Sequence, residues 1–440
     1  MRVLSLLMIV TLGFRVSAAG SDRTAQDTLR GGSSLADCVQ YALAHRPLLQ
    51  QSRLDEDITR KEIAVKLADW FPQVNFNFYV QRNPQPPASL VQGTPVPTLL
   101  AYSSSGQISA SQVIFNRDVL LASSTASDLR EASADQTAST AIDVIVNVSK
   151  AYYAALLTEE QIAVLDEDII RLAQSLKDAR NQYESGIVDK IDYERASISL
   201  NNARAEKTQA VELLKARMGQ LRQQMGYPAT PALVLARDTA GLEEDMLLDT
   251  TRVPHVEQRI EYQLLQAQKR LLEANVHYTK WSFLPSLSAY GSYNYNYQDD
   301  RLSNIFRHDY PSSWIGLQLS LPVLQGGKRF QEIDEAEMQL QRVDYDLGEL
   351  EHSVDAEYLQ ALADYKSSLN SYYTLKENLA LAREVYKTVQ LQYKEGTKAY
   401  LEVITAETDL RSAQVNETDA LYQVLSSKLD VLKALGAIHE

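Results

Sequence analysis

The chain has 440 residues, a formal net charge of −14, 23% charged residues and 45% apolar residues. This length accommodates either a few ordinary domains or one extended architecture. The composition excludes an intrinsically disordered chain, which would be poor in apolar residues. The acidic balance argues against binding to nucleic acid, which requires basic surface.

The N-terminus has the features of an export signal. Arg2 precedes an apolar run over residues 3–14, and small residues follow at positions 16–19. This order predicts a secretory signal peptide over residues 1–19, whose loss with Arg2 and Arg15 lowers the net charge from −14 to −16. No later apolar run reaches the roughly 20 residues that a membrane helix needs. We therefore expect an exported, folded protein without a transmembrane helix.

The first half of the mature chain begins as helix and changes to strand. Ser34 is a suitable N-cap for a helical segment that reaches residue 71, and Pro47 interrupts this segment early. Residues 72–82 then alternate between apolar and polar side chains, which predicts a strand. A Pro-rich loop follows, and residues 107–115 form a second, less regular strand.

A long helix and a tight turn come next. Residues 116–183 contain neither Pro nor Gly, and a straight helix of this length reaches about 100 Å. Gly186 ends this run, and the helical pattern resumes within a few residues. A lone glycine after a helix is the residue that adopts a left-handed conformation at least cost. We therefore expect a helical hairpin with its tip near Gly186.

The second half repeats this order. A helix starts at Pro254, strands are expected over residues 285–297 and 314–324, and a long helix leads to a second tip near Gly396. At an offset of 210 residues, the same residue types recur around both tips: Gln182 and Gln392, Tyr183 and Tyr393, Gly186 and Gly396, Ala196 and Ala406, Leu200 and Leu410.

This recurrence predicts two structural repeats, over residues 34–226 and 253–436, joined by a linker or equatorial segment over residues 227–252. The two shorter helices of a repeat together match the length of its long helix, so we expect them to stack end to end. In the second long helix, apolar residues recur every three or four positions over about seven heptads, which is a coiled-coil stripe. We assign this stripe to packing.

The four strands carry one apolar and one polar face, and their length suits tilted strands in a bilayer. Four strands cannot close a barrel, and an open sheet edge in lipid leaves backbone groups unsatisfied at a cost of several kcal/mol each. A membrane sheet of this kind therefore requires copies of the chain to join edge to edge. The alternative is a soluble exported coiled-coil scaffold or surface structural protein, although soluble sheets seldom expose apolar, tyrosine-rich faces.

No residue pattern indicates catalysis. The six histidines are scattered without metal-ligand spacing, and no nucleophile motif or phosphate-binding glycine loop is present. We therefore expect no enzymatic activity, no cofactor and no metal site.

The ordered set of features resembles the TolC family of outer-membrane efflux proteins. The resemblance rests on the duplicated helix–strand–strand–long helix–helix plan, the Tyr-x-x-Gly tips at Tyr183–Gly186 and Tyr393–Gly396, and the Leu435-Gly436 ending. It covers essentially the whole mature chain. It implies a mixed helical and β-barrel membrane protein, in which a homotrimer forms a barrel in outer-membrane lipid and a helical tunnel through the periplasm.

The resemblance also implies a function. It predicts the outer-membrane channel of a tripartite efflux or type I secretion system, a passive conduit that a periplasmic adaptor (membrane fusion) protein and an inner-membrane pump open at its helical tips. Tyr183, Gly186 and Gly396 mark the tips where the adaptor is expected to dock. The sequence does not identify the transported cargo, because selectivity rests with the pump.

By the same resemblance, Asp192, Tyr393 and Lys398 are expected to form the links that close the periplasmic gate. Glu402 matches the first acidic position at the entrance. Thr405 occupies the second such position, so the resemblance supports only one acidic ring there. A charge-assisted hydrogen bond between neighbouring helices can bias a closed state against an open one.

Overall fold

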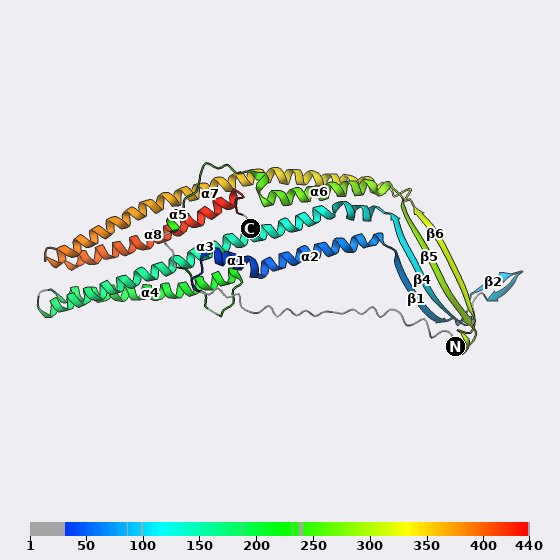
Figure 1. Ribbon diagram of the computed structural model, residues 1–440, viewed down its shortest axis with the longest axis horizontal. Coiled ribbons are helices and arrows are strands. Elements are labelled where there is room, and N and C mark those ends of the chain that lie inside the picture. The colour runs from blue at the N-terminus through cyan, green and yellow to red at the C-terminus, as the bar shows by residue number, and fades with distance from the viewer. Residues whose placement is uncertain are drawn as a thin grey trace.

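The chain is an elongated body with a sheet at one end and two helical tips at the other (Figure 1). This computed structural model describes residues 31–85, 87–97, 100–186, 188–230, 232–236 and 241–438. The expected signal peptide, residues 1–19, lies outside the described residues.

The first repeat supplies four helices that run along the long axis. They are α1 (Leu35–His45), α2 (Pro47–Leu67), α3 (Arg117–Glu184) and α4 (Lys190–Met225), and the 3-10 turn η1 (Ala68–Trp70) follows α2. A capping box starts α1: the Ser34 hydroxyl accepts from the Asp37 backbone N–H, and the Asp37 carboxylate accepts from the Ser34 N–H at 2.9 Å. Pro47 ends α1 and opens α2, because a proline fits the first turn of a helix but not its interior.

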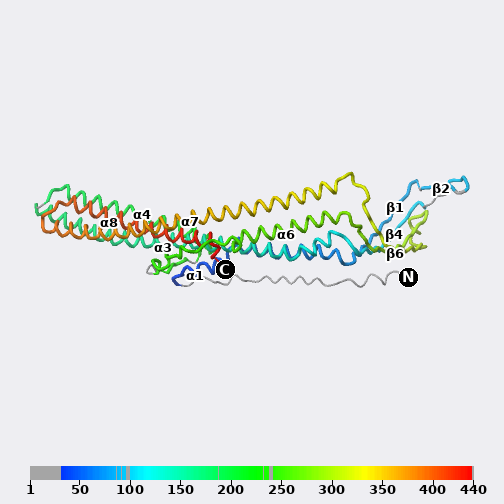
Figure 2. The backbone as a smooth tube through the Cα atoms, turned by 90° about the horizontal axis from the view of Figure 1, so that it is seen from above, coloured from blue at the N-terminus to red at the C-terminus, as the bar shows by residue number. Residues whose placement is uncertain are grey.

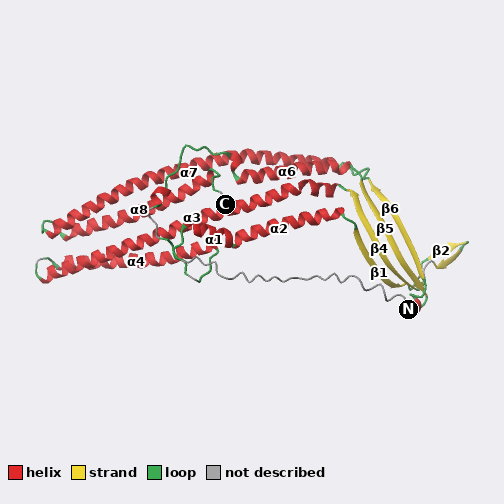
Figure 3. Cartoon of the chain, in the orientation of Figure 1, coloured by secondary structure: helices red, strands yellow, loops and turns green. Residues whose placement is uncertain are grey.

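The second repeat follows the same plan, after a linker that contains the short helix α5 (Leu242–Asp245). Its long elements are α6 (Ile260–Lys280), α7 (Lys328–Lys394) and α8 (Tyr400–Ala434), with the 3-10 turns η2 (Val256–Gln258), η3 (Trp281–Phe283) and η4 (Leu302–Asn304). The shorter helices α2 and α4 pack along α3, and α6 and α8 pack along α7 (Figure 3). Seen from above, the helices of both hairpins lie together at the tip end (Figure 2).

One antiparallel sheet joins the two repeats. Its strands are β1 (Gln73–Arg82), β4 (Tyr102–Phe115), β5 (Ser286–Asp299) and β6 (Asp309–Ser320), in the order β1-β4-β5-β6. Within the sheet, the two repeats meet where β4 pairs with β5, and α3 also packs against α6 and α8. Among the strands that the structure describes, β1 and β6 each have one neighbour, so both outer edges of the sheet are unpaired there.

The strand bounds differ from the sequence-based expectation by more than two residues in β4 and β6. β4 begins at Tyr102 rather than at 107, because Ser103–Ser105 pair with β1 and β5 although they carry no apolar alternation. β6 covers Asp309–Ser320 rather than 314–324, because β5 offers its last partner, Ser286, to Ser320. In both cases the pairing partner, and not the local pattern, sets the end of the strand.

The expected Pro-rich loop between the first two strands contains a small hairpin. β2 (Ala88–Val91) pairs with β3 (Thr94–Pro97) across a turn at Gln92-Gly93. Both turn residues have positive φ, 52° and 81°, as a two-residue hairpin turn requires. This hairpin corrects the expectation that the whole segment forms a loop.

The apolar stripe of α7 is buried, and three of its tyrosines also hold the linker. Tyr358, Tyr365 and Tyr372 are 8%, 1% and 0% exposed. The Tyr365 hydroxyl donates to the Met246 carbonyl at 2.9 Å, and the Tyr372 hydroxyl donates to the Glu243 carboxylate at 2.9 Å. The linker is therefore tied to the middle of the molecule by the polar ends of core side chains.

An arginine joins the stacked helices at the middle of the first repeat. Arg46 precedes α2, and its guanidinium donates to the Gln224 carbonyl at the end of α4 at 2.5 Å. Gly226 then ends α4 with a φ of 69°, and a Cβ atom there would lie 2.9 Å from the Pro47 Cδ. Glycine is required here by both conformation and space.

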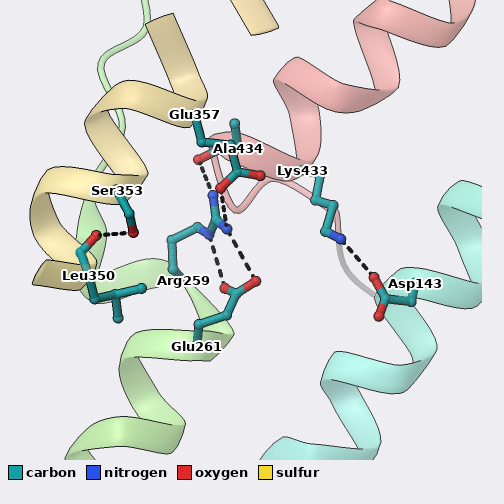
Figure 4. Close-up of polar contacts among 8 residues, drawn as sticks. All are labelled: Asp143, Arg259, Glu261, Leu350, Ser353, Glu357, Lys433 and Ala434. Atoms are coloured by element: carbon teal, nitrogen blue, oxygen red, sulfur yellow. Dashed lines mark hydrogen bonds and ion pairs between the residues drawn. The ribbon is translucent and has the colours of Figure 1, made fainter. Parts of the chain in front are cut away.

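The second repeat has the same joint at Arg259, which precedes α6 (Figure 4). Its side chain is 5% exposed and donates to the Ala434 carbonyl at 3.0 Å. It also pairs with the carboxylates of Glu261 and Glu357, each at 3.0 Å. Because Ala434 stands 210 residues after Gln224, equivalent carbonyls accept from the two arginines.

Candidate functional site

The two faces of the sheet have opposite character. On one face, Ile315, Leu317 and Leu319 of β6 are 94%, 69% and 66% exposed, and Phe76 of β1 is 68% exposed. A contiguous exposed apolar face of this kind indicates contact with lipid or with another protein. With its two unpaired edges, this face has the properties of one segment of a membrane barrel.

The opposite face carries amide and hydroxyl side chains in register. Gln107, Asn294 and Ser312 lie side by side on β4, β5 and β6. The Gln107 amide donates to the Ser292 hydroxyl at 3.0 Å, and the Asn294 amide donates to the Ser312 hydroxyl at 3.4 Å. This face suits contact with water.

At the other end of the molecule, both helical hairpins turn at the expected glycines. Gly186 and Gly396 have φ values of 73° and 74°. The Gly396 N–H donates to the Tyr393 carbonyl at 2.9 Å, and the Thr397 N–H donates to the Gln392 carbonyl at 3.0 Å. These bonds cap the last carbonyls of α7 as in a Schellman motif. Tyr183 precedes the first turn and stacks on Tyr193 of α4, with ring centroids 6.3 Å apart.

The residues expected at the gate gather at these tips in two groups. The Tyr393 hydroxyl donates to Gln182 Oε1 of α3 at 2.7 Å, which links the two hairpins. Burial, followed by the negative charges of Asp192 and Asp178, raises the pKa of Tyr393. The structure therefore brings Asp192 near Tyr393, and the phenol stays protonated as a donor.

Lys398 and Glu402 form the second group. The Lys398 ammonium pairs with the Glu402 carboxylate at 2.5 Å, one turn apart at the start of α8. Both side chains are exposed, so an ion pair of this kind contributes little to stability. In the described part of the chain, Lys398 is thus joined to Glu402 and not to Asp192.

Gln182 was not predicted from the sequence to be the partner of Tyr393. Gln182 was noticed only as one member of the repeated pair Gln182 and Gln392. Its half-buried amide accepts from Tyr393 of the other hairpin. Gln392 is the equivalent residue of the second repeat. The sequence signal that could have indicated this contact is the glutamine that directly precedes the tyrosine at each tip.

A set of buried charged residues further along the hairpins was also missed. Asp168 of α3 and Glu407 of α8 are 2% and 5% exposed. Arg171 pairs with Asp168 and lies over the Tyr386 ring of α7, 5.9 Å from its centroid. Carboxylates are rarely buried to this extent in proteins.

The described residues offer neither a metal site nor a membrane-spanning helix. They contain no group of three or more His, Cys, Asp or Glu side chains that could hold a metal ion. Within the described ranges, no helix combines the length and the apolar character that a bilayer crossing requires.

The sequence matches the family model described as "Outer membrane efflux protein" over residues 38–227 and 258–437. The chain belongs to this family. The predicted resemblance and the outer-membrane location are confirmed, and the soluble scaffold alternative is wrong. The chain is an efflux channel protein of the outer membrane.

Individual relatives agree with the family match. The chain is 21% identical to the outer membrane protein TolC of Vibrio cholerae over 417 residues, with 92% of this chain and 91% of that protein covered. It is 23% identical to the probable efflux pump outer membrane protein TtgC of Pseudomonas putida, with 92% and 83% covered.

Solved structures confirm the fold. The Campylobacter jejuni CmeC outer membrane channel matches with a TM-score of 0.73 at 15% identity, and the match covers 92% of this chain and 86% of that one. The predicted fold class, barrel strands continued by a long helical tunnel in a duplicated plan, is therefore correct.

Proposed function

We propose that three copies of this chain join edge to edge into one passive conduit, which a periplasmic adaptor and an inner-membrane pump open at the helical tips. The observation that carries this proposal is the open sheet, with unpaired edges at β1 and β6 and an exposed apolar face. In lipid, every unpaired backbone group costs several kcal/mol, so the edges must meet other strands.

Energy comes from the pump, and the chain itself catalyses no reaction in this proposal. A tripartite efflux assembly and a type I secretion system make the same demand on the channel: a wide lumen with a polar lining. The amide and hydroxyl face of the sheet fits this demand because water and solutes of many kinds form hydrogen bonds with it.

The proposed gate consists of Asp192, Tyr393, Lys398 and Glu402. Tyr393 links the hairpins through Gln182, and Asp192 adds a negative charge near the same hydroxyl. Lys398 and Glu402 stand exposed at the start of α8, where a neighbouring chain can reach them. An opening motion that separates the hairpins must break the bond between Tyr393 and Gln182.

The proposed docking positions for the adaptor are the tips themselves, marked by Tyr183, Gly186 and Gly396. Both glycines adopt a left-handed conformation with open space around the missing Cβ. Tyr183 is 41% exposed beside the first turn and offers an aromatic surface to a partner.

The test is single-channel conductance of the purified oligomer in a planar bilayer, with wild type beside Asp192→Ala. Asp192→Ala removes the negative charge near the Tyr393 hydroxyl, and in the proposed gate this change weakens the closed state, so the fraction of open channels is expected to rise. Glu194→Ala is the matched control, since Glu194 lies on the same helix in an exposed pair with Lys190. Equal conductance in wild type and Asp192→Ala would remove Asp192 from the gate.

A further inference from the structure

A buried carboxylate lies between the two hairpins, seven residues beyond the start of α8. This residue, Glu407, is 5% exposed and faces Asp168 and Arg171 of α3. The position is about 10 Å of helix from the first residue of α8. Glu407 is therefore close to the proposed gate but shielded from the water that surrounds the tips.

Each positive group near Glu407 already has another carboxylate as its partner. Arg171 is paired with Asp168 on its own helix. Arg411 of α8 is paired with Glu206 of α4 at 3.3 Å, and its side chain is 16% exposed. Glu407 is thus one of three carboxylates that share two guanidinium groups.

The remaining neighbours on the packed helices do not supply a positive charge. Among the described residues, the charge of Glu407 also helps to raise the pKa values of Tyr386 of α7 and Tyr400 of α8, and both of these groups are phenols. The hydrogen bonding around Glu407 is incomplete. In the part of the chain that the structure describes, buried polar atoms without a hydrogen-bond partner include Glu407 Oε1, the Tyr400 hydroxyl and Arg171 Nε.

This arrangement is unfavourable for an ionised carboxylate and acceptable for a protonated one. A buried charge without its own counter-ion costs several kcal/mol, whereas a neutral carboxylic acid both donates and accepts hydrogen bonds. Because Asp168 and Arg171 belong to the first hairpin and Glu407 to the second, separating the hairpins would let water reach Glu407.

We propose that Glu407 is a proton-controlled positioning residue of the tunnel: the protonated side chain keeps the two hairpins packed, and the ionised side chain favours their separation. This inference rests on the proposed opening at the tips. It concerns a different position from the exposed gate residues, because Glu402 and Lys398 are in contact with water and Glu407 is not.

The sign of the pH dependence follows from the burial. Burial, reinforced by the charge of Asp168 and opposed by Arg171 and Arg411, raises the pKa of Glu407 from 4.5 to about 7. In an open, hydrated state the pKa returns toward its ordinary value. The packed state therefore binds the proton more tightly, so it is stabilised as the pH falls through 7 and loses this advantage as the pH rises above 7.

The size of the effect follows from the same two values. Between about pH 8 and about pH 6, a pKa of about 7 in the packed state against 4.5 in the open state changes the open-to-packed ratio about tenfold per chain. Ordinary exposed carboxylates do not titrate in this range, since their pKa values lie near 4.

The experiment measures the fraction of time that the reconstituted oligomer is open, at about pH 8 and about pH 6, in a planar bilayer. Four proteins are compared: wild type, Glu407→Gln, Glu407→Asp and Glu194→Gln. Because the change is about tenfold for each chain, the open fraction of the wild-type oligomer is expected to fall by at least about tenfold on acidification. Glu407→Gln cannot ionise, so it is expected to show the acidic behaviour at both pH values.

The other two variants complete the comparison. Glu407→Asp keeps a titrating carboxylate and is expected to keep a pH-dependent opening, whereas a purely structural role would predict similar damage in both variants. Glu194→Gln removes an exposed carboxylate and is expected to follow wild type. The histidines are present in all four proteins, so any contribution from them cancels.

Two outcomes would overturn the inference in distinguishable ways. Current with an unchanged pH profile in Glu407→Gln would refute the role of Glu407 and leave the conduit intact. No current from any of the four proteins would refute the proposed conduit and this inference with it.

Discussion

Replacement of Arg259 by methionine tests the joint between the stacked helices. Arg259 is buried and holds the end of α8, the start of α6 and the middle of α7 through Ala434, Glu261 and Glu357. Methionine keeps most of the apolar stem but removes the donors. The carbonyl and two carboxylates then lose their shared partner.

The expected loss in the free energy of unfolding is about 2–4 kcal/mol. Hydrogen bonds to charged groups contribute roughly 1.5–3 kcal/mol each. The side chains of Glu261 and Glu357 are 37% and 47% exposed, so water replaces part of what the arginine supplied. The estimate is therefore well below the sum over the individual bonds.

The assay is urea unfolding in detergent micelles, followed by far-UV circular dichroism of the helices. Arg252→Met is the matched control: Arg252 is 62% exposed, and its closest carboxylate, on Asp249, is 3.9 Å away. We expect this control to lie within about 0.5 kcal/mol of wild type. If Arg259→Met lowered the free energy of unfolding by no more than the control does, Arg259 would not stabilise the joint between the helices.

Two further predictions concern the turn glycines and the linker. Gly226→Ala and Gly186→Ala both place a side chain at positive φ, at a cost of about 1–2 kcal/mol. At Gly226 the new Cβ also lies 2.9 Å from a proline ring at the start of α2. Urea unfolding should therefore show a loss larger by about 1–3 kcal/mol for Gly226→Ala, and equal losses would contradict the close approach. Tyr372→Phe removes the bond to Glu243. Losing this hydrogen bond should lower the free energy of local opening of α5 by about 1 kcal/mol, so amide exchange in α5 should become about fivefold faster. Tyr373→Phe, at a position 50% exposed, is the control, and identical exchange in both variants would mean that the tyrosine does not hold the linker.

Much of the fold could be predicted from local patterns. The Pro- and Gly-free run before Gly186 predicted one long helix, and the structure has α3 as an unbroken helix of 68 residues. The alternation in residues 72–82 predicted β1 almost to the residue. The hairpin β2–β3 was missed because it lies in a proline-containing segment, with Pro95 and Pro97 in β3 itself, although Gly93 supplied the turn.

The sequence placed the candidate gate residues at the helical tips, but it did not show which of them contact one another. Asp192, Tyr393 and Lys398 were assigned by position in a repeated motif, and this assignment is still a prediction. The bond from Tyr393 to Gln182 joins residues 211 positions apart, and it depends on the register of α7 against α3. Helical periodicity indicates which face of each helix packs but not which turn meets which turn.

The sequence by itself determined the duplicated plan, the two tips and the two-faced strands, because each depends on residues that are near one another in the chain. Only the tertiary structure decided that Arg259 lies among Glu261, Glu357 and Ala434, and that Glu407 is buried beside charges that are already paired. These environments arise where separate helices meet, and the burial of a charged side chain is a property of all its neighbours together. A glutamate in a helical heptad has the same letter whether it faces water or a neighbouring helix, so its chemistry follows from the packing.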